Sequence, residues 1–208
     1  MQRAYVYIDG FNLYYGCIKG TDCKWLDVSK LCALYLPKYD VRQIRYYTAY
    51  VTPRPDDPNQ IERQRVYIRA LKTLPNLTVH FGRFISKEKD MYLAKSKPGK
   101  PEFATVIRTE EEGSDVNLAT HLLHDAVKNR YDVAIVVSND SDLLEPVRIV
   151  RRNYGKTVGL LNPQNKPSKH LRKNTDFVKQ IRHGPLKACQ FPPTLADSKG
   201  TITKPSSW

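Results

Sequence analysis

Short apolar runs alternate with amphipathic segments along most of the chain. Runs rich in apolar and β-branched residues predict strands at residues 4–8, 41–51, 77–85, 132–137 and 157–161. Apolar residues at helical spacing predict helices over residues 12–18, 27–36, 60–73, 114–129 and 142–152, and a last short element is expected at 175–181. Strands that alternate with helices in this way predict an α/β sandwich with a mostly parallel central sheet.

The helix over residues 114–129 is the most strongly marked. Ser114 is suited to the N-cap, and apolar residues recur at helical spacing: Val116, Ala119, Leu123, Ala126 and Val127. His121 and His124 fall on the polar face, and a helical H-x-x-H without a further ligand motif is a weak metal signal. The strand at 132–137 is almost entirely apolar, as expected when both of its faces are covered.

Three stretches interrupt this alternation. Residues 53–58 contain prolines and predict a turn. Residues 86–103 are basic and contain Pro98 and Gly99, so we expect an exposed loop or hairpin there. From residue 183 on, Pro, Ser and Lys dominate, which predicts a domain over 1–182 followed by a poorly ordered tail over 183–208.

The charge balance favours a polyanionic partner. The 208 residues include 34 Lys and Arg against 21 Asp and Glu, and the net charge of +13 favours nucleic acid, although a merely solvated basic surface gives the same count. No apolar run approaches about 18 residues, so no membrane span is expected. The cysteines form no C-x-x-C pair and indicate reduced thiols in a cytoplasmic protein: Cys17, Cys23, Cys32 and Cys189.

Carboxylates follow two predicted strands at the same edge of the sheet. Asp9 comes directly after the first strand, and Asp140 and Asp142 follow the strand at 132–137. Asp115 lies in the first turn of its helix. Ligands collect at the carboxyl ends of parallel strands, so these acids can converge there. Clustered carboxylates repel one another unless a cation compensates them, and oxygen ligands suit Mg²⁺ or Mn²⁺.

Each acid also has a local explanation. Asp9 could form a turn with the following glycine, and Asp115 could simply favour the helix dipole. Asp140 or Asp142 could cap the next helix. Glu110–Glu112 would usually be a solvated acidic run. A rim of unrelated caps is therefore the alternative to a metal site.

An acidic metal pocket within a basic surface suits a nuclease. The metal can generate hydroxide from bound water and stabilise charge on the leaving oxygen, while the basic surface holds the phosphate backbone. Asn12 and Ser138 lie next to the acids and could bind a water or a phosphate oxygen. Some tyrosines could stack on bases, although aromatics in helices and strands are more often core residues: Tyr14, Tyr15, Tyr46 and Tyr47.

Three sequence blocks occur in this order along the chain: Y-I-D-G-F-N-L-Y at residues 7–14, E-E-G-S-D-V-N-L-A-T at 111–120 and V-S-N-D-S-D-L at 137–143. Together they resemble the signatures of the NYN domain, a branch of the PIN-like nuclease superfamily. The resemblance spans roughly residues 1–181. It implies a PIN-like three-layer α/β/α sandwich and a ribonuclease that depends on Mg²⁺ or Mn²⁺.

The resemblance also assigns individual positions. Asp9, Asp115 and Asp140 match the acids of the family's metal site. Further matches are Asp142, Asn12 and Ser138, which complete the expected catalytic set, and Glu111. Two positions near the site depart from the family pattern, because Glu112 stands where a lysine is common and His121 where an acid is common.

The sequence therefore predicts a metal-dependent endoribonuclease. The three matching acids would hold the metal, Asp142 would assist through water, and basic side chains in 86–100 and 166–173 would follow the RNA backbone. Two alternatives stay open: a non-catalytic RNA-binding or adaptor protein with a vestigial acidic site, and a phosphohydrolase acting on a small substrate. PIN-like folds often pair, so a homodimer is a further option.

Overall fold

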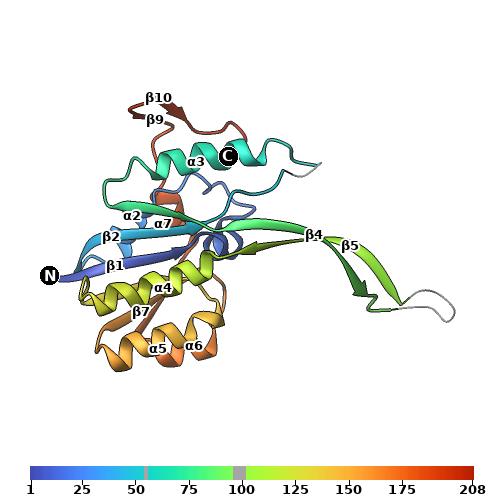
Figure 1. Cartoon of the computed structure of the whole chain (residues 1–208). Coiled ribbons are helices and arrows are strands. Elements are labelled where there is room, and N and C mark those ends of the chain that lie inside the picture. The colour runs from blue at the N-terminus through green and yellow to red at the C-terminus, as the bar shows by residue number, and fades with distance from the viewer. Residues whose placement is uncertain (54–55, 96–101) are drawn as a thin grey trace.

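The computed structural model describes residues 1–53, 56–95 and 102–208. At its centre lies a six-stranded sheet in the order β3-β2-β1-β6-β7-β8, in which every neighbouring pair is parallel (Figure 1). Its strands are β1 (Gln2–Asp9), β2 (Tyr39–Thr48), β3 (Leu77–Phe81), β6 (Val133–Val137), β7 (Thr157–Asn162) and β8 (Phe177–Gln180). This arrangement confirms the predicted α/β fold with a parallel central sheet.

Helices cover both faces of the sheet, which becomes the middle layer of three (Figure 1). One face carries α1 (Gly10–Leu13), the π-helical η1 (Tyr14–Ile18), α2 (Val28–Tyr35), α3 (Gln60–Leu71) and α7 (His183–Ala188). The other face carries α4 (Ser114–Val127), the 3-10 turn η2 (Ser141–Leu143), α5 (Leu144–Asn153) and α6 (Lys169–Asn174). The chain therefore forms the expected α/β/α sandwich.

An apolar core lies on each side of the sheet, because neighbouring residues of a strand point to opposite faces. In β1, Val6 and Ile8 belong to the core under α2 and α3, while Tyr7 belongs to the core under α4 and α5. All five residues of β6 are buried and divide between the two cores in the same way. This explains why the sequence of β6 is apolar throughout instead of alternating.

The buried face of α4 differs from the predicted one. Val116 and Val127 are 68% and 56% exposed, while Leu118 and Leu122 are fully buried. The helix also buries the charged Asp125, and this acid on the core face hides the true apolar stripe from a count of hydrophobic residues. Its N-cap is Gly113 at a φ of 96°, so the predicted N-cap at the next residue is wrong by one position. A left-handed φ favours glycine.

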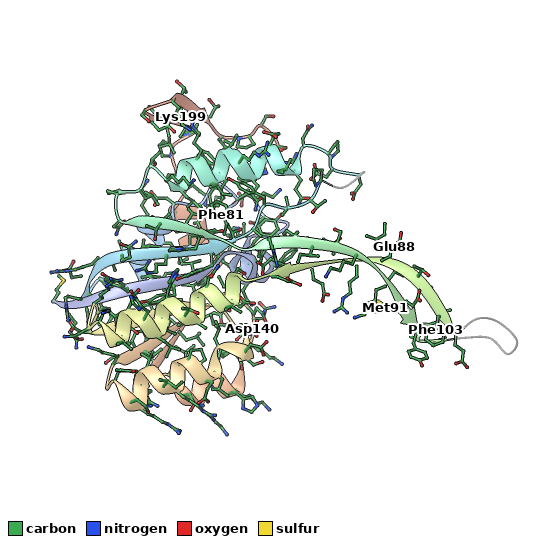
Figure 2. The ribbon with its side chains drawn as sticks, viewed as in Figure 1. Phe81, Glu88, Met91, Phe103, Asp140 and Lys199 are labelled. Carbon is green, nitrogen blue, oxygen red and sulfur yellow. The ribbon has the colours of Figure 1, made fainter. Side chains whose placement is uncertain are left out.

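The strand predicted at 77–85 divides at Gly82. The first part is β3, and the second continues as β4 (Arg83–Tyr92), which pairs antiparallel with β5 (Phe103–Glu112). This hairpin leaves the sandwich as an arm, along which Glu88, Met91 and Phe103 are placed (Figures 1 and 2). The basic stretch is thus a hairpin, of which residues 96–101 lie outside the described ranges.

The other boundaries shift by a few residues. The helix predicted at 12–18 consists of α1 and η1, and the one predicted at 142–152 consists of η2 and α5. The sequence gives no sign of α6, because Leu171 is its only buried residue. The turn predicted at 53–58 lies partly outside the described residues. Within the described part of the chain, no helix combines the length and apolar character needed to cross a membrane.

Residues 183–208 pack on the sandwich, which corrects the expectation of a poorly ordered tail. They form α7 and an antiparallel pair, β9 (Thr194–Asp197) and β10 (Gly200–Thr203). The rings of Phe191 and Trp208 lie 5.7 and 6.3 Å from the ring of Trp25. Arg69 on α3 pairs with Asp197 at 2.5 Å. The high Pro, Ser and Lys content masked the few aromatic residues that anchor this segment.

Replacing Phe191 by Ala should lower the free energy of unfolding by about 3 kcal/mol, because a large buried ring is removed from its contact with Trp25. Chemical denaturation followed by circular dichroism measures this change. Ser198→Ala, at an exposed position of the same segment, is the matched control and should leave stability unchanged. A Phe191→Ala protein as stable as the parent would contradict the packing described above.

Candidate active site

Asp9 lies at the carboxyl end of β1 and is only 6% exposed. Its extended backbone makes it the N-cap of α1, and its Oδ1 accepts a hydrogen bond from the backbone N–H of Asn12 at 2.9 Å. Its Oδ2 accepts a second hydrogen bond from the Ser138 hydroxyl at 3.0 Å. The sequence allowed a local turn of Asp9 with the following glycine, and the structure shows a helix cap instead, which holds the carboxylate at the edge of the sheet.

The loop after β6 is tied to the loop after β1. The backbone N–H of Asn139 donates to Oδ1 of Asn12 at 3.0 Å, and that of Asp140 donates to Oγ of Ser138 at 3.1 Å. Asp140 in turn caps η2, since its Oδ1 accepts from the backbone N–H of Asp142 at 3.0 Å. One oxygen of Asp140 therefore serves the helix start, and the other is available to a ligand at the edge of the sheet.

Asp115 joins these acids from the first turn of α4. Burial, and after it the negative charge on nearby carboxylates, together raise the pKa of Asp115 to about 6. These carboxylates are Asp9, Asp140, Glu111 and Asp142. The structure therefore gathers at one edge the three acids predicted to hold a metal, together with Asp142 and Glu111. Asn12 and Ser138 lie in the same place as hydrogen-bond partners of this group.

Glu111 has a structural part that the sequence left open. Its Oε1 accepts from the backbone N–H of Ser114 at 3.2 Å, and its Oε2 accepts from the Ser114 hydroxyl at 2.7 Å. It thereby caps α4 from the end of β5. Gly82 allows this arrangement, because a Cβ at that position would lie 2.0 Å from Oε1 of Glu111. The base of the hairpin and the start of α4 are consequently fixed to each other.

The donor set suits a hard divalent cation held partly through water. Within residues 1–53, 56–95 and 102–208, no three of these carboxylates bring one oxygen each within 4.8 Å of one another. Mg²⁺ keeps several waters and takes only one or two direct carboxylates, so this wider spacing fits it. A cation would also relieve the repulsion that raises the pKa of Asp115. The assignment of Asp9, Asp115 and Asp140 as its ligands stays a prediction.

The comparison with protein families identifies the family of this chain. The family model described as the NYN domain matches residues 3–181, which is most of the chain. The chain belongs to the NYN domain family. Membership places it in a nuclease-like family, as the sequence blocks indicate.

Two further similarities extend beyond the NYN model. The chain is 32% identical to 6-hydroxy-3-succinoylpyridine 3-monooxygenase HspA of Pseudomonas putida, over 99% of this chain and 75% of that protein. A crystal structure of a protein of unknown function from Vibrio parahaemolyticus superimposes with a TM-score of 0.59 at 18% identity. That match covers 88% of this chain and 94% of the other, and it supports the fold alone.

A different group of potential metal ligands lies outside this NYN site. Oδ1 of Asp22, Sγ of Cys23 and Nε2 of His183 lie 3.4–3.7 Å from one another. The Cys23 thiol donates to Asp22, Lys187 forms an ion pair with the same carboxylate, and Nε2 of His183 lies 3.5 Å from it. These contacts account for the closeness of the three groups, and we assign no metal there.

Further along α4, the NYN domain contains a buried polar network that the sequence does not reveal. Asp125 is fully buried and accepts hydrogen bonds at 2.8–3.2 Å from Tyr7, Arg45 and Arg130. These partners come from β1, β2 and the loop after α4. A buried carboxylate is stable when it is paired and hydrogen-bonded in this way. Its partners are distant in sequence, so no local motif could have identified it.

His121 takes part in an adjoining cluster instead of facing solvent, while His124 is exposed as predicted. Nδ1 of His121 lies 3.0 Å from the Tyr47 hydroxyl, and the His80 ring stacks on Tyr47 with centroids 5.1 Å apart. Burial, and after it the neighbouring His121 and Arg45, together lower the pKa of His80 to about 4. His80 is therefore neutral in the folded protein at neutral pH.

The contribution of His80 to the free energy of unfolding should fall as the pH drops from about 6.5 to about 4. The unfolded chain binds a proton at His80 near pH 6.5, whereas the folded protein binds it only near pH 4. His80→Phe keeps a ring on Tyr47 and should make this fall smaller. Urea unfolding at several pH values measures it. The exposed His170→Phe is the control and should keep the slope of the parent; equal slopes in all three proteins would contradict the assignment.

Proposed function

We propose that this NYN domain is a metal-dependent ribonuclease that cleaves phosphodiester bonds of RNA with Mg²⁺ or Mn²⁺. The observation that carries the proposal is the hydrogen bonding through Ser138 that joins Asp9 and the backbone of Asp140 at one edge of the sheet, where their charges also act on Asp115. A fold retains such repulsion readily when a cation belongs there. When bound, the cation would activate a water and stabilise charge on the leaving oxygen.

The side chains around that cation would have different roles in binding and positioning. Asp9, Asp115 and Asp140 would hold it, one or two of them directly and the rest through bound water, and the exposed Asp142 would assist through a bound water. Ser138 donates to Asp9 and accepts from the backbone of Asp140, so it orients two of the acids at once. In the same way, the carbonyl of the Asn12 side chain positions the loop that carries Asp140, while its amide nitrogen is the group that could donate to a phosphate oxygen.

Basic side chains stand beside this edge of the sheet. Asn139 donates to the side chain of Gln164 and to the backbone carbonyl of Lys166, and it accepts from the backbone of Ser168. These bonds hold the start of the basic stretch 166–173 against the loop of Asp140. On the other side, the hairpin that begins next to Gly82 carries further lysines. With the net charge of +13, this distribution supports RNA as the substrate.

Asp9→Asn and Asp140→Asn should each reduce Mn²⁺-dependent cleavage of labelled RNA by at least about a hundredfold, because each removes a charge that holds the cation. Each should also lose the rise in melting temperature that Mn²⁺ gives the parent. Asp40→Asn is the matched control, since the Asp40 side chain is 43% exposed and lies at the start of β2, at the opposite edge of the sheet.

Two outcomes would contradict this function. Undiminished cleavage by purified Asp140→Asn would overturn the mechanism. Salt-sensitive RNA binding without cleavage in any divalent ion would favour the adaptor alternative. A small phosphate ester assayed beside the RNA tests the phosphohydrolase alternative.

The homodimer and the cytoplasmic location stay predictions. Light scattering tests the homodimer.

A second candidate function comes from the Pseudomonas relative. Its similarity covers 99% of this chain, including residues 183–208, which the NYN model does not reach. The relative is named for the oxidation of a substituted pyridine. Oxygen uptake in the presence of that pyridine and an electron donor, beside the RNA assay on the same preparation, separates the two candidates. Uptake without RNA cleavage would favour the oxygenase.

A further inference from the structure

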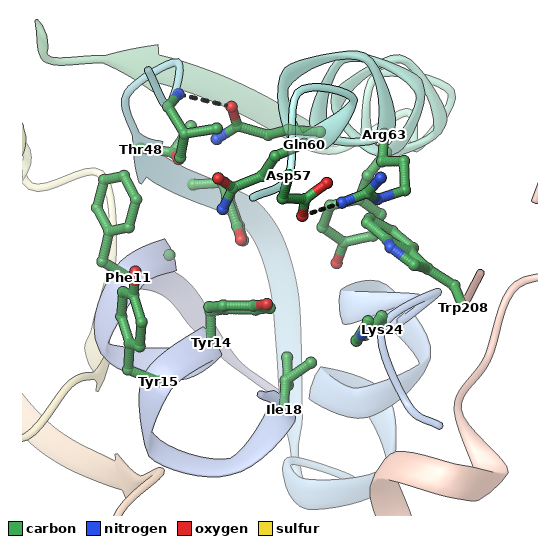
Figure 3. Close-up of a pocket in the computed structure, with 15 residues that line it drawn as sticks. Phe11, Tyr14, Tyr15, Ile18, Lys24, Thr48, Asp57, Gln60, Arg63 and Trp208 are labelled. Carbon is green, nitrogen blue, oxygen red and sulfur yellow. Dashed lines mark hydrogen bonds and ion pairs between the residues drawn. The ribbon is translucent and has the colours of Figure 1, made fainter. Parts of the chain in front are cut away.

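A cavity of about 150 Å³ lies beside the acidic edge, on the face of the sheet that carries α1, α2 and α3 (Figure 3). Its walls come from α1 and η1, the carboxyl end of β2, the start of α3 and the segment 183–208. Six aromatic side chains line it: Phe11, Tyr14, Tyr15, Tyr46, Tyr67 and Trp208. Segments that are far apart in the sequence thus enclose one aromatic chamber.

The cavity and the acidic site share a wall. Gly10 and Phe11 line the cavity and directly follow Asp9 in the chain. A Cβ at Gly10 would lie 2.8 Å from the Tyr46 ring, so that ring rests on the backbone next to Asp9. Phe11 also packs edge-on against Phe84 at the base of the hairpin, with centroids 5.5 Å apart. An occupant of the cavity would therefore lie next to a strand of RNA at the metal site.

Size and chemistry define the occupant. An apolar cavity of about 150 Å³ holds a benzene-sized ring. Polar groups stand at one side of this one: Arg63 forms an ion pair with Asp57, and Lys24 and Gln60 lie nearby (Figure 3). A chamber with aromatic walls and a few polar groups binds a flat ring and fixes its orientation through the polar edge. Nitrogen heterocycles have that combination of a π-face and a polar edge.

We propose that this cavity binds one flat nitrogen heterocycle. The proposal rests on the proposed function, in which the heterocycle is an unpaired RNA base next to the scissile phosphate. Unstacked bases are commonly received by aromatic side chains, which compensate the lost stacking. The NYN domain would then cut single-stranded or looped RNA in preference to a duplex, since a paired base cannot enter a chamber of one ring's size. A free small heterocycle has the same chemistry and is the other source of such a ring.

Intrinsic fluorescence can report binding, because Trp208 lines the cavity and the chain has only two tryptophans. The metal-free full chain is titrated with AMP, UMP and pyridine-3-carboxylate. We expect saturable binding that Tyr14→Ala weakens about tenfold and that Tyr14→Phe retains. Gln60→Phe, which adds volume at the polar side and adds no tryptophan to the fluorescence signal, should also block binding. Tyr154→Ala, at an exposed ring at the end of α5, is the matched control.

Every outcome is informative. Binding of a nucleotide that both Tyr14→Ala and Gln60→Phe weaken supports the proposal and an RNA base as the source. Binding of the pyridine alone, with the same response to the variants, supports the ring site and assigns it to a free heterocycle. No saturable binding, or binding that neither variant changes, overturns the proposal. RNA cleavage by the parent is measured in parallel: its absence contradicts the ribonuclease without affecting the cavity, whereas normal cleavage with no binding overturns the cavity alone.

Discussion

The arrangement of the acids at the carboxyl edge of the sheet depends on one buried carboxylate that accepts two hydrogen bonds. Oδ1 of Asp9 binds the first turn of α1, and Oδ2 binds Ser138 at the end of β6. Because β1 and β6 are the two central strands and run parallel, these bonds align the loops of both strand ends. Asn12 repeats the connection through the backbone of Asn139. A change at Asp9 would therefore disturb both the charge and the position of the other acids.

The negative charges of the same acidic cluster work against the stability of the folded protein. Burial and neighbouring charge raise the pKa of Asp9 as well as that of Asp115. In the absence of a cation, such acids favour the protonated form and oppose full ionisation of the folded protein. The basic surface does not cancel this repulsion locally, since the carboxylates lie in a partly buried site. The unfavourable field that they create is what would give a divalent cation its affinity.

Much of the fold and of the site follows from local sequence patterns, and the exceptions have long-range causes. Asp9 and Asp140 were predictable because each follows a strand, and parallel strands share one carboxyl edge. The core face of α4 was not, because buried Asp125 is compensated by Arg45 from another element. The division of the β3–β4 run at Gly82 depends on Glu111, which arrives 29 residues later in the chain. The sequence likewise does not reveal the aromatic contacts of 183–208, because they are made with Trp25, which is distant in the chain.

Gly10 couples the two sites into one functional edge. Its backbone continues Asp9 on one side and supports the Tyr46 ring on the other, and a Cβ there would also lie 2.7 Å from the Tyr47 carbonyl oxygen. The backbone at Gly10 therefore lies between the acidic cluster and the aromatic cavity, in close contact with Tyr46 and Tyr47. Trp208 closes the cavity from the segment 183–208, so this segment contributes to the same edge as the NYN signatures. The region predicted to be a tail is, in this fold, part of the wall that would select the substrate.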